Sequence, residues 1–125
     1  MKSPSTSKID GRRKSDIIAS AMTENPLNVL PLGGEIDLHV SPQISNSLRT
    51  IIKKQPTHVV VDLSQVTYID SSGLAILIEA MQDVGKYGGK FALAGLQESV
   101  RPIFEIARLD QIFKIYPDTA AALAV

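Results

Sequence analysis

The sequence predicts an α/β fold in which helices cover a single, mixed and mostly parallel β-sheet. Three observations lead to this prediction. Short apolar or alternating segments, each of strand length, are separated by longer segments whose apolar residues recur at helical spacing. Gly, Ser and Pro stand at the boundaries between the two kinds of segment. Strands that alternate with helices are typical of a parallel sheet covered by helices. The expected order is β-β-α-β-α-β-α-β-α.

The chain has 125 residues, enough for one domain with a sizeable core. Residues 1–16 are polar, Ser-rich and basic, with almost nothing to bury. Residues 1–25 are therefore expected to form a flexible N-terminal extension, and residues 26–125 the packed domain.

An antiparallel hairpin is expected to open the domain. Its strands are residues 27–32 and 35–40, with a tight turn at Gly33-Gly34. Ser41-Pro42 then indicates the start of a helix, because a serine hydroxyl can cap free amides and proline suits the first turn. The apolar face of this helix consists of Ile44, Leu48, Ile51 and Ile52.

Residues 58–63 are the most strand-like segment, and their three consecutive valines suit a central strand buried on both faces. A helix is expected to follow, ending near Lys86, where glycines supply stop signals. The remaining elements are a strand at 90–95, a helix at about 99–109, a strand at 112–116 and a short Ala-rich helix opened by Pro117-Asp118. In the helix at 99–109, Pro102 should lie in the first turn, and Ile103, Phe104, Ile106 and Ala107 should face mostly inward.

The junction between the central strand and the long helix reads Tyr68-Ile69-Asp70-Ser71-Ser72-Gly73-Leu74. The simplest interpretation is a helix cap supplied by Ser71 or Ser72. The same residues can present a serine for phosphorylation or use one as a nucleophile. Helical spacing places Leu74, Leu77, Ile78 and Met81 on the core face of the helix. Ile76 then falls on the solvent face, one turn from the serines, where it can contact a partner.

Several function classes find little support. A serine nucleophile needs a nearby base, the only histidines are His39 and His58, and no G-x-S-x-G motif exists. There is no cysteine, no metal-ligand spacing and no phosphate-binding glycine loop, so no metal or cofactor is expected. Thirteen basic and thirteen acidic residues cancel, which argues against direct nucleic-acid binding. No apolar run approaches the ~20 residues of a membrane span, so a cytoplasmic protein is expected.

The chain resembles the STAS domain and, within that family, the stand-alone bacterial anti-sigma factor antagonists. The resemblance covers about residue 27 to the end of the chain. It rests on the order and spacing of five motifs: Gly34-Glu35-Ile36-Asp37, Val60-Val61-Asp62-Leu63-Ser64, Ile69-Asp70-Ser71-Ser72-Gly73-Leu74, Gly88-Gly89-Lys90 and Leu109-Asp110-Gln111-Ile112-Phe113. Arg108 departs from the pattern, because a glycine often precedes the leucine there.

The resemblance implies a phosphorylation switch. Ser71 would be phosphorylated by an anti-sigma factor serine kinase that carries the ATP, and a PP2C-type phosphatase would restore it. The unphosphorylated protein would bind the kinase and release the sigma factor. The residues expected at the partner surface are Asp37, Asp70, Ser72, Gly73, Leu74 and, from the helical spacing, Ile76. The alternative is a STAS scaffold or accessory subunit without this switch, as in a stressosome or a lipid transporter. A monomer or weak dimer is expected.

Overall fold

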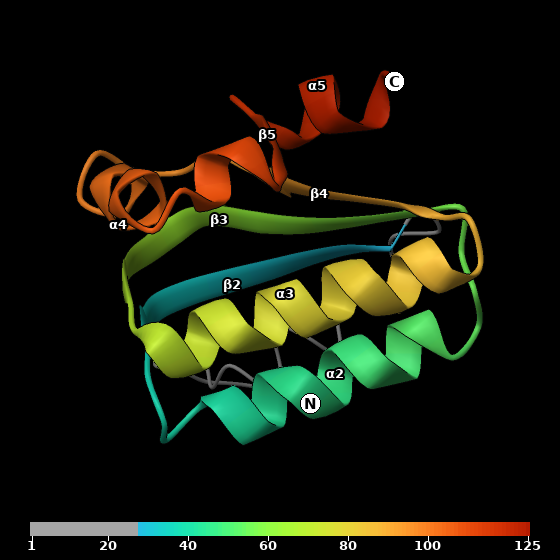
Figure 1. The fold of residues 1–125 in the computed structure, drawn as a ribbon, viewed down its shortest axis with the longest axis horizontal. Coiled ribbons are helices and arrows are strands. Elements are labelled where there is room, and N and C mark those ends of the chain that lie inside the picture. The colour runs from blue at the N-terminus through green and yellow to red at the C-terminus, as the bar shows by residue number, and fades with distance from the viewer. Residues whose placement is uncertain (1–27) are drawn as a thin grey trace, which may run out of the picture.

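The computed structural model describes residues 28–125. The expected N-terminal extension, and the first residues of the expected domain, therefore lie outside the described part of the chain. The described residues form one four-stranded sheet in the order β2-β3-β4-β5, and each neighbouring pair of strands is parallel. The predicted α/β class is confirmed (Figure 1).

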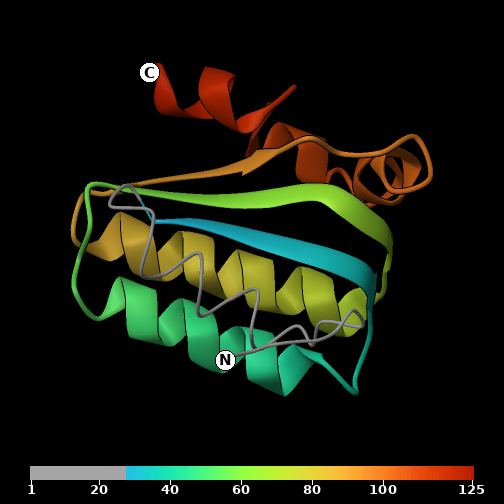
Figure 2. The same ribbon diagram turned by 180° about the vertical axis from the view of Figure 1, so that it is seen from behind.

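From β2 on, strands and helices alternate along the chain, as the sequence predicted for everything after the opening hairpin. In chain order they are β2 (Val29–Ile36), α2 (Ser41–Ile52), β3 (His58–Ile69), α3 (Ser71–Lys86), β4 (Lys90–Ala94), α4 (Arg101–Ile106), the 3-10 helix η1 (Leu109–Gln111), β5 (Lys114–Tyr116) and α5 (Thr119–Leu123). Helices α2 and α3 run side by side, and α5 lies well away from them (Figures 1 and 2).

The predicted opening hairpin is wrong. Gly33 and Gly34 lie inside the single strand β2, where they pair with Gln65 and Val66 of β3 in parallel register. The register shifts on both sides of the glycine pair, and Gly34 has a φ of 73°. The glycines therefore provide an irregularity within one strand instead of a chain reversal. The long neighbour β3 accounts for this, because it offers pairing partners to both halves of β2.

The two faces of the sheet have different cores. The larger core lies between the sheet and helices α2 and α3, and it includes Val59, Val61 and Leu63 of β3. A smaller cluster on the other face contains Val60 and Ala122 of α5. Because Val59, Val60 and Val61 are all buried, the prediction of a strand buried on both faces is confirmed.

The inward face of α3 differs from the prediction. Its buried residues are Gly73, Leu77, Ala80 and Val84, while Leu74, Ile78 and Met81 are half-buried. Ile76 is also half-buried and packs against the larger core, so its predicted place on the solvent face is wrong. The reason is that Gly73 brings the start of the helix directly onto the sheet and turns Ile76 toward it.

Helix α4 is shorter than predicted. Pro102 does lie in its first turn and Phe104 is buried, but Ile106 is 85% exposed and Ala107 is exposed. The chain leaves the helix at Arg108, which adopts a left-handed conformation with a φ of 62°. That is the position where the family often has glycine, and glycine adopts this conformation without the steric cost that a Cβ brings.

Candidate functional site

The candidate site lies at the carboxyl ends of the neighbouring strands β2 and β3. The last residues of these strands, Ile36 and Ile69, are register partners. The Asp70 amide donates to the Ile36 carbonyl oxygen at 3.0 Å, which holds the two strand ends together. Helices α2 and α3 both begin within a few residues of this point. The predicted site residues Asp37 and Asp70 are thereby brought together from separate parts of the chain.

Asp70 caps helix α3. Its Oδ1 atom accepts hydrogen bonds from the Ser72 hydroxyl at 2.6 Å, the Ser72 amide at 2.9 Å and the Gly73 amide at 3.2 Å. The Ser72 hydroxyl, followed by these amides, lowers the pKa of Asp70 against the opposing effect of desolvation. The prediction that Ser71 or Ser72 caps the helix is therefore wrong, because the extended conformation of Asp70 places its carboxylate over the first amides.

Ser72 also connects α3 to the start of α2. Its Oγ lies 2.8 Å from the Oγ of Ser41, which is itself 2.7 Å from the Asp37 carbonyl oxygen. An ionised Asp70 can only accept, so the Ser72 proton goes to Asp70. The single Ser41 proton then has two acceptors, the Asp37 carbonyl and Ser72 Oγ. These contacts join the starts of two helices through one part-buried polar network.

Ser41 is the site residue that the sequence analysis missed. It was expected to cap α2, but Val40 occupies the cap position and Ser41 is the first helical residue. Ser41 is only 5% exposed and is the one buried polar residue in the described range. Its partner Ser72 is 31 residues away in sequence, and nothing local in the sequence signals that contact.

Gly73 is required by close packing. A Cβ atom at this position would lie 2.7 Å from Ile36 Cγ2 and 2.7 Å from Ile69 Cγ1. Both isoleucines are buried at the ends of their strands, so neither side chain can easily withdraw. The absence of a side chain at residue 73 thus sets the distance between the start of α3 and the sheet.

Ser71 contrasts with Ser72. It is the first residue of α3 and is exposed, and its hydroxyl makes no hydrogen bond with any residue in 28–125. Ser72, half-buried, is engaged by Asp70 and Ser41. Of the two adjacent hydroxyls, only that of Ser71 is available to another molecule.

The loop between β2 and α2 supplies the exposed apolar residue that was expected at Ile76. Leu38 is 72% exposed and directly follows Asp37. The Asp37 carboxylate accepts from the His39 amide at 3.0 Å and lies 3.8 Å from His39 Nδ1, so it holds its own loop in shape. Leu38 thereby projects from an ordered turn beside the start of α3.

The described residues provide no group of three or more side chains that could hold a metal ion. The Ser71 hydroxyl has no histidine partner in the same range. None of the helices in residues 28–125 is long and apolar enough to cross a membrane.

Comparisons with known proteins place the chain in a family. The STAS domain model matches residues 19–122. The anti-sigma-B factor antagonist of Listeria monocytogenes is 30% identical over 84 residues, which cover 67% of this chain and 74% of that protein. The anti-sigma-F factor antagonist RsfB of Mycobacterium tuberculosis is 29% identical over 107 residues, covering 86% and 87%.

A solved structure gives the same result. The crystal structure of an anti-sigma factor antagonist from Mycobacterium paratuberculosis matches with a TM-score of 0.71 and 30% identity, over 77% of this chain and 81% of that one. The chain therefore belongs to the STAS domain family and, within it, to the anti-sigma factor antagonists.

Proposed function

We propose that this protein is a phosphorylation-controlled antagonist that acts in the cytoplasm. In its unphosphorylated form it binds an anti-sigma factor serine kinase and so releases the sigma factor. Phosphorylation of Ser71 by that kinase ends binding, and a PP2C-type phosphatase reverses the modification. The observation that carries this proposal is a contrast between two hydroxyls. That of Ser71 is exposed and makes no hydrogen bond within residues 28–125, whereas that of Ser72 is engaged.

A phosphate on Ser71 would alter the surface and leave the fold intact. The positive end of α3 favours a negative charge at this place by about 0.3–1 kcal/mol. The Ser72 and Gly73 amides already donate to Asp70, so they are not free to bind the phosphate. The phosphate would therefore stay exposed, adding about −1.5 to −2 charges next to the Asp70 carboxylate. Loss of binding then arises at the interface with the kinase, where the phosphate would repel acidic groups of the kinase or clash with its surface.

The partner surface follows from what is exposed around Ser71. Leu38 offers an apolar side chain on the neighbouring loop, and Ala75 is exposed one helical turn after Ser71. Asp70, Ser72 and Gly73 are at least half-buried, so they act on binding by positioning Ser71 and the first turn of α3. Asp37 shapes the loop that presents Leu38.

The proposal is tested by incubating the protein with an anti-sigma factor serine kinase of the same organism and ATP, then locating the phosphate by mass spectrometry. We expect phosphate on Ser71 in the wild type and in Ser47→Ala, a matched change on α2, and none in Ser71→Ala. In a direct binding assay, Ser71→Ala should bind the kinase like the wild type, and Ser71→Asp at least about tenfold more weakly.

Phosphate on Ser72, or on the serines of residues 1–27 alone, would contradict the assignment. Equal binding of the kinase by Ser71→Ala and Ser71→Asp would show that charge at this position does not control the interaction. Binding without any phosphorylation would favour the alternative of a STAS scaffold or accessory subunit.

A further inference from the structure

A hollow of about 420 Å³ lies at the amino ends of β3 and β4. Ser71 follows the carboxyl end of β3, so the hollow and the phosphorylation site are at opposite ends of this 12-residue strand. The lining comes from β3, α3, β4, the segment around β5 and the end of the chain: His58, Val60, Met81, Gly85, Gly89, Lys90, Phe91, Ala92, Ile112, Lys114, Tyr116, Ala122 and Val125.

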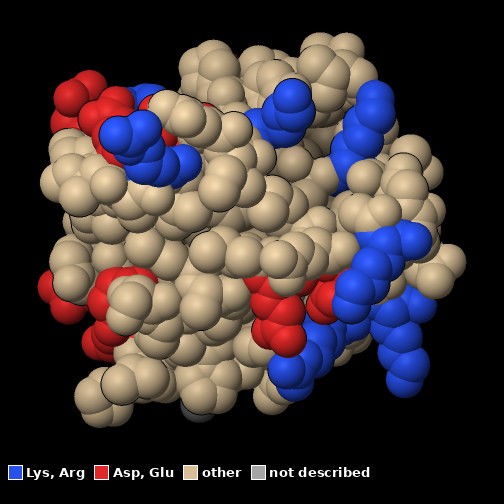
Figure 3. All heavy atoms as spheres, viewed as in Figure 1, with Lys and Arg blue, Asp and Glu red and all other residues tan. Residues whose placement is uncertain are grey.

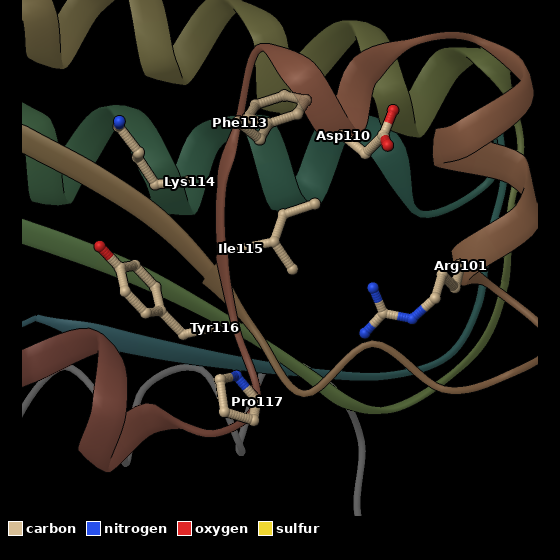
Figure 4. A pocket seen from close by; sticks show the side chains of 7 residues that line it. All are labelled: Arg101, Asp110, Phe113, Lys114, Ile115, Tyr116 and Pro117. Atoms are coloured by element: carbon tan, nitrogen blue, oxygen red, sulfur yellow. The ribbon is translucent and has the colours of Figure 1, made fainter.

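Strand register places the three basic residues of this lining on one face of the sheet. His58 pairs with Lys90, and Ala92, two residues after Lys90, pairs with Lys114. Paired residues, and residues two apart in one strand, point to the same face. Figure 4 agrees, since Lys114 and Tyr116 project to one side of β5 and Ile115 to the other. The shared face is the one on which α5 packs.

The floor of the hollow is apolar and made of small side chains. Val60 and Ala92 are buried beneath it, and Ala122 of α5 lies against the same cluster. β5 begins opposite Ala92, so the first two residues of β4, Lys90 and Phe91, have no partner from β5. The hollow continues around this open edge to the larger core, where Phe91 belongs. Its volume and apolar lining are typical of small-molecule sites.

The charged side chains of the lining have one sign. No aspartate or glutamate contributes to the lining, and neither Lys90 nor Lys114 forms an ion pair with any residue of the described range. His58 Nε2 lies 3.2 Å from the Val125 carbonyl oxygen, which holds the last described residue at the rim. On the face in Figure 3, Lys and Arg gather toward the end where α2 and α3 finish, with Asp and Glu side chains beside some of them. The charged side chains that line the hollow itself therefore favour an anion.

A second hollow, of about 570 Å³, lies on the Ile115 side of β5, with both Arg101 and Asp110 in its lining (Figure 4). Its mixed charges select no class of ligand. The hollow beneath α5, in contrast, combines an apolar floor with two lysines that form no ion pair within the described part of the chain.

We propose that the hollow under α5 binds a single-chain fatty carboxylate. The alkyl chain lies on Val60, Ala92 and Ala122, and the carboxylate meets the ammonium groups of Lys90 and Lys114, whose flexible stems can bring them to the rim. The lining has no Asp, Glu, Asn or Gln side chain to read the edge of a nucleobase by hydrogen bonds, which disfavours a nucleotide. This site is independent of Ser71 and of the proposed switch.

The test is a titration of the ¹⁵N-labelled full-length protein with octanoate, decanoate and dodecanoate below their micelle concentrations, followed by NMR. We expect saturable shifts of the Lys90, Ala92 and Ala122 amides, and affinity that rises about fourfold per buried CH₂. Acetate, which has the head alone, and 1-octanol, which has the chain without the charge, should both bind much more weakly than the longer carboxylates.

The double variant Lys90→Gln/Lys114→Gln should weaken dodecanoate binding about tenfold. Lys53→Gln/Lys54→Gln is the matched control, because these exposed lysines lie at the end of α2 and outside the hollow, and it should bind like the wild type. Equal effects of the two double variants, equal affinity for octanol and octanoate, or no saturable binding would each overturn the proposal. Ser71→Asp should bind dodecanoate like the wild type, so failure of the switch leaves this test unaffected.

Discussion

The two ends of β3 are constructed in different ways. At the carboxyl end, hydrogen bonds among Asp70, Ser72 and Ser41 join the starts of two helices, and Gly73 packs against the strand ends. At the amino end, small apolar side chains leave a hollow, and the lysines at its rim have no ion-pair partner among residues 28–125. The carboxyl end of β3 is tightly packed, whereas the amino end has an open hollow with two lysine side chains at its rim.

This difference fits the two kinds of site that we propose for one small sheet. A phosphorylatable hydroxyl must be presented in a constant position. The network around Ser71 holds the backbone and leaves that hydroxyl without a hydrogen bond to any described residue. A pocket for an alkyl chain needs volume and loosely held charges instead. Substitutions should therefore be costly at the carboxyl end of β3 and well tolerated at the amino end.

The largest effect is expected for Gly73→Ala. Its new Cβ would clash with Ile36 and Ile69, and we expect the free energy of unfolding to fall by about 1–3 kcal/mol in urea denaturation. Gly85→Ala is the matched control in the same helix, because a Cβ there has no atom within 4 Å. It should leave stability unchanged or raise it by up to about 1 kcal/mol. If Gly73→Ala and Gly85→Ala lost similar amounts of stability, the two ends of β3 would not differ in how tightly they are packed.

The sequence predicted what local patterns determine. Apolar spacing and turn residues gave the α/β class, a helix that begins within one residue of the predicted start at Pro42, and the end of α3 at Lys86. The apolar run of valines correctly marked β3 as buried on both faces. These features depend on residues close together in the chain, so they are readable without a structure.

What the sequence could not predict depends on contacts between distant segments. Gly33-Gly34 permits a turn or a bulge, and only pairing with the long strand β3 selects the bulge. Asp70, Ser71 and Ser72 are all residue types that cap helices well. Which of them does so depends on whether α3 begins one residue earlier or later. The contact of Ser41 with Ser72 joins the start of α2 to the start of α3, 31 residues further along the chain. The roles of Ser71 and its partner residues stay predictions until phosphorylation is measured.

A smaller effect is expected from removing the Asp70 charge. Because the folded-state pKa is lowered, the ionised carboxylate stabilises the fold fully above its ordinary value of 3.8, and this contribution is lost as pH falls through the lower folded-state pKa. Asp70→Asn should therefore be less stable than the wild type at pH 7, and the difference should shrink below about pH 3.8. Denaturation at several pH values measures this difference.

The control for Asp70 is Asp110→Asn, since the exposed Asp110 carboxylate makes no hydrogen bond with any described residue. It should change stability by no more than about 0.5 kcal/mol at pH 7. A difference between Asp70→Asn and the wild type that stays constant from pH 7 to pH 3 would show that the Asp70 charge does not contribute through these hydrogen bonds.

The smallest effect concerns the link between the two helix starts. In a double-mutant cycle with Ser41→Ala and Ser72→Ala, we expect a coupling free energy of about 0.5–1 kcal/mol, because their hydroxyls are 2.8 Å apart in a part-buried site. Ser47→Ala with Ser72→Ala should be additive, since the Ser47 hydroxyl bonds only to Gln43 within α2. If the Ser41–Ser72 pair is also additive, Asp70 alone fixes the start of α3, and α2 does not take part in presenting Ser71.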